Sequence, residues 1–248
     1  MFWKILGIAV LILVPGTLQA DIITQWTFEG AVITPSTGAG TASLFGGTTA
    51  TFATGNSGGQ GWNTTTYADQ STGSGTRGVQ FLASTAGFSD IKLAFDHRAS
   101  GTASRWAQID YTLNGGTSWT TGFWNNNGGL SPHDNFYSFN VDFSSVTGAN
   151  NNAGFGIRVV SIFSPLAFDQ SSTLADFAAN TAYMRANAGA VYSPNTSTAT
   201  GDYGTSGTWR FDNVTITGVP EPSSAVLLGT LGFALASQRR FLRRRRAA

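Results

Sequence analysis

The sequence predicts an all-β protein, an antiparallel β-sandwich for which the jelly roll is the favoured topology. Among 248 residues there are 31 Gly, 18 Phe and 7 Trp, but only 11% are charged, whereas about a quarter are charged in an average domain. Several segments alternate apolar and polar residues, as half-buried strands do. An Asn-Gly turn also follows one of these segments. Together these features favour short strands joined by glycine-rich loops.

Three strands are expected in the N-terminal half, at residues 24–28, 91–96 and 105–113. Each alternates with period two, so one face of each should point into the core. The inward residues are expected to be Trp26 and Phe28; then Ile91, Leu93 and Phe95; then Ala107, Ile109, Tyr111 and Leu113.

The third strand runs into Asn114-Gly115-Gly116, which predicts a hairpin because these residues tolerate the positive φ angles of tight turns. Residues 136–143 alternate again, with Tyr137, Phe139, Val141 and Phe143 on one face. Residues 155–163 are nearly all apolar, which predicts a central strand covered on both faces. Residues 209–217 should close the sandwich beside residues 24–28. Residues 172–190 have a helical composition and should form at most a turn or two of helix.

Charge is distributed unevenly along the chain. From Asp21 to Gly218 there are 12 acidic and 7 basic residues, giving −5, whereas the segment from Val219 onward carries six arginines and one glutamate. The middle of the chain therefore lacks the cationic face that nucleic-acid binding requires, and we exclude that function class.

Cysteine is absent from the sequence, so disulfides, thiolate metal sites and a cysteine nucleophile are excluded. The stability of the domain must therefore come from packing of its apolar core.

The N-terminus follows the pattern of a signal peptide over residues 1–20. Lys4 precedes the apolar run 5–14, Pro15-Gly16 end that run, and cleavage is expected between Ala20 and Asp21. Ten apolar residues are too few to cross a bilayer core, which needs about 20. We therefore expect export, with residues 21–218 forming the sandwich domain.

The C-terminus, residues 219–248, contains three features in a fixed order. Pro220-Glu221-Pro222 comes first, the apolar run 225–236 follows, and a cluster of arginines ends the chain. Arginines beside an apolar segment favour the cytoplasmic side, so we expect a short helix held in the inner membrane. The cluster comprises Arg239, Arg240, Arg243, Arg244, Arg245 and Arg246.

This order resembles the PEP-CTERM sorting signal of Gram-negative bacteria that produce exopolysaccharide. The resemblance implies that exosortase, a membrane-embedded transpeptidase, recognises the tail, cuts near the motif and delivers the protein to the envelope or extracellular matrix. Pro220, Glu221 and Pro222 would then be recognition residues of a substrate. Such tails also carry the label of an ice-binding protein C-terminal domain, but residues 21–218 lack the regular Thr-x-Thr ladder of an ice-binding face.

The sequence contains no established metal-binding motif. His97 and His133 each neighbour an aspartate, but no H-E-x-x-H or comparable spacing exists. Calcium is the one metal that we keep as a candidate, because loop aspartates, asparagines and backbone oxygens suit it. Its candidate ligands are Asp134, Asp202, Asp212 and Asn213.

The sequence offers little for catalysis. Glu29 is the only glutamate in residues 21–218, and a glycosidase would need two of Asp96, Asp110, Asp142 and Asp212 to converge in a cleft. The nucleophile elbow of a hydrolase also needs a strand-to-helix context, and no serine of residues 21–218 lies in one. We therefore predict that the protein is not an enzyme.

Three tryptophans lie in polar, glycine-rich contexts where an exposed ring could stack on a sugar: Trp62, Trp119 and Trp124. The leading interpretation is an exported structural or adhesive protein of the envelope or extracellular polysaccharide matrix. A carbohydrate-binding module is the alternative, and it would require exposed tryptophans along one face or rim. An extracellular hydrolase is a third reading, which would require two converging carboxylates.

Overall fold

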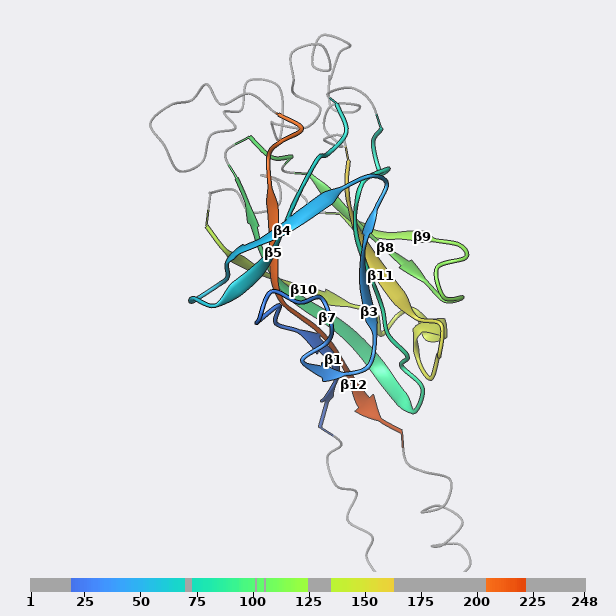
Figure 1. Ribbon diagram of the computed structural model, residues 1–248. Helices are drawn as coiled ribbons and strands as arrows, with labels where there is room; N and C mark the ends of the chain where they lie inside the picture. Colours follow the sequence, from blue (N-terminus) through green and yellow to red (C-terminus); the bar gives the residue numbers. More distant parts are fainter. Residues whose placement is uncertain are drawn as a thin grey trace, which may run out of the picture.

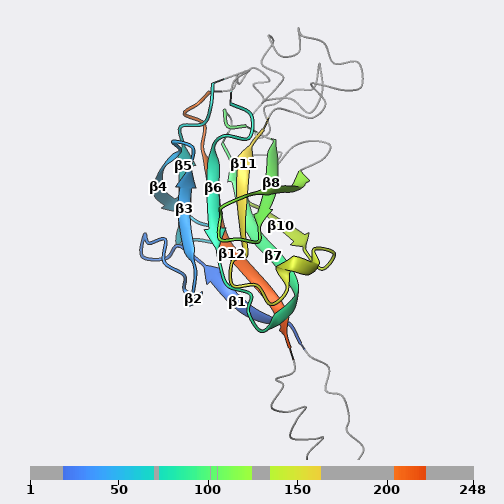
Figure 2. The ribbon, with the colours of Figure 1, turned by 90° about the vertical axis from the view of Figure 1, so that its right-hand side faces the viewer.

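Two antiparallel sheets pack face to face in the computed structural model (Figure 1, Figure 2). The structure describes residues 19–69, 73–100, 102–104, 106–124, 135–162 and 204–221. These confirm the predicted all-β sandwich. Within these ranges the only helical element is the short 3-10 turn η1 (Thr147–Ala149), and no helix is long and apolar enough to cross a membrane. The expected helical turns at 172–190 lie outside the described residues.

Sheet A contains seven strands, in the order β10-β7-β12-β1-β2, with β5 beside β12 and β4 beside β5. All of its pairings are antiparallel. Its strands are β1 (Asp21–Trp26), β2 (Thr37–Gly38), β4 (Thr49–Thr54), β5 (Gln60–Thr65), β7 (Phe88–Ala99), β10 (Tyr137–Asp142) and β12 (Trp209–Pro220).

Sheet B contains five strands, in the order β3-β6-β11-β8-β9, and β11 lies at its centre. Its pairings are antiparallel as well. Its strands are β3 (Thr41–Phe45), β6 (Gly78–Leu82), β8 (Ala107–Thr112), β9 (Thr120–Trp124) and β11 (Gly156–Ser161).

The core fills the space between the sheets, and the period-two alternation explains its membership. In β7 the predicted inward residues Ile91, Leu93 and Phe95 are at most 2% exposed. Trp26 and Phe28 are equally buried, and both rings approach Phe81 of sheet B, at centroid distances of 5.0 and 6.5 Å. Aromatic contacts between the sheets therefore hold the layers together.

The two ends of the sandwich lie side by side, as predicted for its first and last strands. Asp21 of β1 is the cross-strand partner of Gly218 in β12. β12 continues beyond the expected boundary at residue 218, because Val219 and Pro220 pair with Ser89 and Phe88 of β7. Both strands leave the domain at the same end in two views (Figure 1, Figure 2).

Two sequence expectations need correction. Strand β11 is central, but its outer face is not apolar throughout, since Arg158 points out of the core and is only partly buried. Leu113, expected to face inward, follows the end of β8 and is 38% exposed, because the chain turns there into the hairpin. The hairpin itself is confirmed, with positive φ angles of 69° at Gly115 and 90° at Gly116.

Candidate functional site

A row of polar side chains crosses the outer face of sheet B. Ser43 pairs with Gln80, Gln80 with Arg158, Arg158 with Asp110, and Asp110 with Thr121. We call these five residues the polar row. Their neighbours along each strand, such as Ala42, Val79 and Ile157, are buried in the core, so the row must face away from it. At about 4.8 Å per strand, the row spans about 19 Å.

An ion pair lies at the centre of the polar row. The Nε of Arg158 donates a hydrogen bond to the Oδ2 of Asp110 at 2.7 Å. The other carboxylate oxygen, Oδ1, accepts a hydrogen bond from the Nε2 of Gln108 at 2.6 Å. Asp110 is 1% exposed, so the pair is well shielded from water on the carboxylate side. This pairing fixes the direction in which the guanidinium is presented.

The guanidinium of Arg158 lies between two aromatic rings. Its central carbon is 4.8 Å from the ring centroid of Phe45 and 4.8 Å from that of Trp119. Both distances are within the range of cation–π attraction. Phe45 packs on a small buried cluster of Trp106, Val160 and Ile162, which holds its ring in place.

Trp119 is held by the hairpin between β8 and β9. The side chain of Asn114 organises this turn, because its Oδ1 accepts hydrogen bonds from the Thr112 hydroxyl and from the Ser118 backbone N–H, both at 2.9 Å. Its Nδ2 donates to the Ser118 hydroxyl at 2.8 Å. The Asn-Gly-Gly sequence therefore does more than reverse the chain, since it also sets the position of an aromatic ring over the polar row.

Several polar groups of the row have no hydrogen-bond partner among the residues that the structure describes. These are the side-chain amide of Gln80, the hydroxyl of Ser43 and the two terminal nitrogens of Arg158. Each of these side chains is partly exposed. Amide and guanidinium groups offer several donors and acceptors in fixed planes, so this face can bind a ligand rich in hydroxyl groups.

No family model and no curated protein matches the chain. Solved structures with a similar arrangement include the CBM22-1 xylan-binding domain from Paenibacillus barcinonensis Xyn10C, at 10% identity and a TM-score of 0.45, with 84% of this chain and 100% of that chain covered. The CBM22-1–GH10 modules of Clostridium thermocellum endo-1,4-β-D-xylanase 10B, complexed with xylohexaose, align at 12% identity and a TM-score of 0.42 over 73% of this chain. An exo-β-agarase aligns at 12% identity and a TM-score of 0.44 over 81% of this chain. This chain spans 26% of each of the latter two. Because these identities and TM-scores are low, the similarities do not identify a ligand of this chain.

The three tryptophans proposed from the sequence have different environments. Trp119 is half-buried beside Arg158, as described above. Trp62 is 3% exposed, so the expectation of an exposed ring is wrong there: β5 turns it toward Phe28 and Phe81. Trp124 ends β9, and its side chain lies outside the described part of the chain.

The candidate calcium ligands are only partly placed. Asp212 is 2% exposed, and its Oδ2 accepts a hydrogen bond from the backbone N–H of Asn56 at 2.7 Å. Asn213 follows it with a positive φ of 48° and donates from Nδ2 to Asp96 at 2.9 Å. Asp134 and Asp202 lie outside the described residues. No group of three His, Cys, Asp or Glu side chains that could hold a metal occurs within the described ranges.

Asp96 and Asp212 are cross-strand partners on sheet A, and their carboxyl groups titrate differently. Burial raises the pKa of Asp212 to about 6, and the neighbouring carboxylates of Asp96 and Glu29 act in the same direction. Burial also acts to raise the pKa of Asp96. Hydrogen bonds from Asn56, Ser138 and Asn213 together outweigh this effect, so the pKa of Asp96 is lowered overall. Asp96 is 9% exposed and the tip of the β4–β5 hairpin contacts both groups, so we assign the pair a structural role.

The expected processing sites flank the sandwich. Asp21 begins β1, and Ala20 immediately precedes it. Pro220 ends β12, and the backbone N–H of Glu221 donates to the carbonyl of Gly87 at 2.8 Å. Pro222, the apolar run and the arginine cluster lie outside the described residues.

Sequence reasoning did not find the polar row, although its signals were present. Ser43, Gln80, Arg158 and Asp110 each have a buried core residue next to them in the strand, so period-two alternation points each of them outward. What the sequence lacks is the register that aligns them, because β6 and β11 are neighbours in space and distant in the chain.

Proposed function

We propose that the protein is an exported glycan-binding module whose polar row binds a segment of polysaccharide. The observation that carries the proposal is the row itself: five cross-strand partners that cross the whole of sheet B, with Arg158 held between Phe45 and Trp119. The length of the row, about 19 Å, suits an extended chain better than a single small molecule.

The chemistry of the row matches a sugar chain. Amide, guanidinium and hydroxyl groups bond vicinal hydroxyls, and half-buried aromatic rings offer apolar contact to the C–H face of a sugar ring. Because the Arg158–Asp110 pair balances its own charge, the row does not require a strongly charged ligand. Recognition through unused hydrogen-bond groups also favours selectivity, since a ligand without matching hydroxyls would leave those groups unpaired.

The location that we propose follows from the two ends of the sequence. A signal peptide over residues 1–20 would export the chain, and the PEP-CTERM-like tail over 219–248 would bring it to an exosortase in the inner membrane. Binding of extracellular polysaccharide would then place the protein in the envelope or matrix, in an adhesive role without catalysis. We also infer a jelly-roll topology, in which β1-β12-β7-β10 face β6-β11-β8-β9.

The test is a binding measurement on the full chain with a panel of soluble neutral and acidic polysaccharides, in calcium and in a chelator. We expect saturable binding to at least one of them, and Gln80→Ala should weaken it about fivefold, the value of one hydrogen bond of about 1 kcal/mol. Gln25→Ala is the matched control, since Gln25 is also partly buried but lies on sheet A.

Two results would overturn the proposal: no binding of any polysaccharide by the wild-type chain, or equal weakening by both glutamine substitutions. If the wild-type chain binds in calcium but not in the chelator, calcium is part of the site, and the polar row remains the contact surface.

A further inference from the structure

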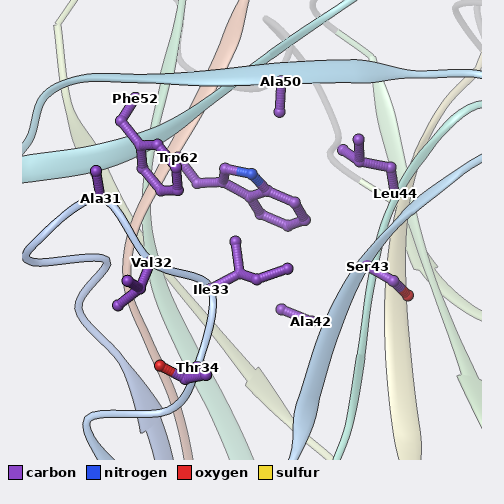
Figure 3. A pocket seen from close by; sticks show the side chains of 10 residues that line it. All are labelled: Ala31, Val32, Ile33, Thr34, Ala42, Ser43, Leu44, Ala50, Phe52 and Trp62. Carbon is purple, nitrogen blue, oxygen red and sulfur yellow. The ribbon is translucent and has the colours of Figure 1, made fainter.

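An apolar pocket of about 600 Å³ opens at the side of the sandwich, away from the polar row's centre (Figure 3). Its volume is within the range of small-molecule sites, about 300–1,000 Å³. The loop after β1 forms one wall, the edge strand β3 another, and the β4–β5 hairpin a third. We call it the side pocket; it is lined by Ala31, Val32, Ile33, Thr34, Ala42, Ser43, Leu44, Ala50, Phe52 and Trp62.

Exposed apolar side chains gather at the mouth of the side pocket. In the described part of the chain, five large hydrophobic residues are notably exposed, and Val32, Ile33 and Leu44 are three of them, at 46%, 39% and 38%. Figure 3 shows Ile33 pointing toward the Trp62 ring. Single exposed hydrophobes need no explanation, but three that converge on one recess mark an interaction site.

The floor of the side pocket is rigid. The Trp62 ring stacks on Phe28 at a centroid distance of 5.7 Å and an angle of 26°, and meets the Phe81 ring edge-on at 6.0 Å. Both partners are at most 1% exposed. Trp62 is 3% exposed, so a ligand would touch only an edge of the indole, but that edge is already in place, which lowers the entropic cost of binding.

The loop wall adopts an uncommon backbone conformation. Phe28 and Ala31 have φ angles of 56° and 57°, values that non-glycine residues rarely adopt. The turn is closed by a hydrogen bond from the Ala31 N–H to the Phe28 carbonyl at 3.2 Å. Because of this turn, the chain does not run directly from β1 into β2, and Val32 and Ile33 lie at the pocket. Strain of this kind tends to occur at binding sites.

The lining defines the chemistry of the occupant. None of the ten lining residues is charged, and the only polar side-chain groups among them are the hydroxyls of Thr34 and Ser43 and the indole N–H of Trp62. The Ser43 hydroxyl points away from Trp62 (Figure 3). A charged group or a sugar ring inside would lose its hydration without replacement, which is costly.

We propose that the side pocket binds the alkyl chain of a neutral amphiphile, with the polar head remaining at the mouth. The side pocket shares only Ser43 with the polar row, and the hydroxyl of Ser43 points away from Trp62, so the proposal does not depend on the glycan-binding proposal. The chain would contact mainly the exposed aliphatic groups of Val32, Ile33 and Leu44, and the head would stay in water.

Decyl maltoside below its micellar concentration is a suitable probe, with maltose as the headgroup control, and calorimetry on the full chain measures both. We expect saturable binding of decyl maltoside that is at least about tenfold tighter than any binding of maltose. Equal affinity for the two would show that the alkyl chain contributes nothing and would overturn the alkyl-chain proposal. Absence of decyl maltoside binding would overturn it as well, whatever polysaccharide the polar row binds.

Matched substitutions locate the site. Leu44→Glu should weaken decyl maltoside binding about tenfold or more, because a carboxylate at the mouth opposes apolar contact. Leu113→Glu is the control: Leu113 is equally exposed, at 38%, but does not line the side pocket. Val32→Glu, on the loop, gives an independent second reading. Thermal melts verify that each variant folds. Equal binding by the Leu44 and Leu113 variants would place the ligand elsewhere, including at the apolar tail, and refute the assignment.

Discussion

Replacing Asp212 with asparagine should remove a pH-dependent loss of stability. Asp212 is 2% exposed, and burial raises its pKa from 3.8 to about 6. Since one pKa unit corresponds to about 1.4 kcal/mol, ionising this carboxyl in the folded state costs up to about 3 kcal/mol. The backbone N–H groups of Asn56 and Asn213 already offset part of the burial effect, so this value includes them.

The sign follows from linkage. The pKa of Asp212 is higher in the folded than in the unfolded state, so its contribution is fully present below pH 3.8 and is lost as pH rises through about 6. An asparagine cannot ionise, so the Asp212→Asn variant should not lose this stability as pH rises. The variant also loses acceptor capacity toward the two backbone N–H groups, but that loss is the same at every pH and cancels in the comparison.

The assay is denaturant unfolding of both proteins at pH 4, 5.5 and 7, with a chelator present. We expect the stability difference, variant minus wild type, to increase by about 2 to 2.5 kcal/mol between pH 4 and pH 7, since part of the full effect is already present at pH 4. A difference that does not change with pH would refute the reasoning. Repeating the series in calcium tests the predicted metal site, because a site that uses Asp212 should stabilise the wild type and not the variant.

Two further predictions concern the core and a turn. His97 is fully buried against Phe95, Phe211 and Trp209, and burial lowers its pKa from 6.5 to about 3, so folding should lose up to about 5 kcal/mol as pH falls through that window. His97→Gln should not show this acid-side loss. Denaturant unfolding at pH 4 and 7 measures it, and an equal loss of unfolding free energy in the wild type and the variant would contradict the prediction. Gly46 and Gly47 both have positive φ, but a Cβ at Gly46 would lie 1.7 Å from the Thr76 carbonyl oxygen, whereas a Cβ at Gly47 meets nothing within 4 Å. Gly47→Ala should therefore cost about 1–2 kcal/mol and Gly46→Ala clearly more, as thermal melts can show, and similar costs would mean that the backbone yields there.

The sequence predicted the strands whose alternation is strong and missed those where it is weak. Residues 91–96 and 137–143 gave their inward faces correctly, because large apolar residues recur at every second position. Strands β3, β4 and β5 contain many Thr, Ser and Gly residues, so few side chains mark their inner face, and β6 alternates but is only five residues long. Trp62 is the instructive case, since its polar neighbours suggested exposure whereas the register of β5 with β12 places it in the core.

The candidate site could be predicted only in part. Trp119 was proposed from its glycine-rich context, and it lies beside Arg158. The polar row depends on pairing between strands that are far apart in the chain, and no local pattern encodes that pairing. The side pocket likewise arises where a loop, an edge strand and a hairpin meet, which a single segment cannot reveal.

The antiparallel pairing of β1 with β12 determines how the sandwich responds to mechanical force. Because Asp21 and Gly218 are partners at one end of that pair, pulling the two chain ends apart would separate the strands one hydrogen bond at a time. A load that enters through a ligand on sheet B and leaves along β12 acts differently. It pulls β12 lengthwise between β1 and β7, so many hydrogen bonds resist it together. If the chain is tethered at its C-terminal end and binds a glycan on sheet B, as we propose, this geometry resists load from the ligand better than load from the N-terminus.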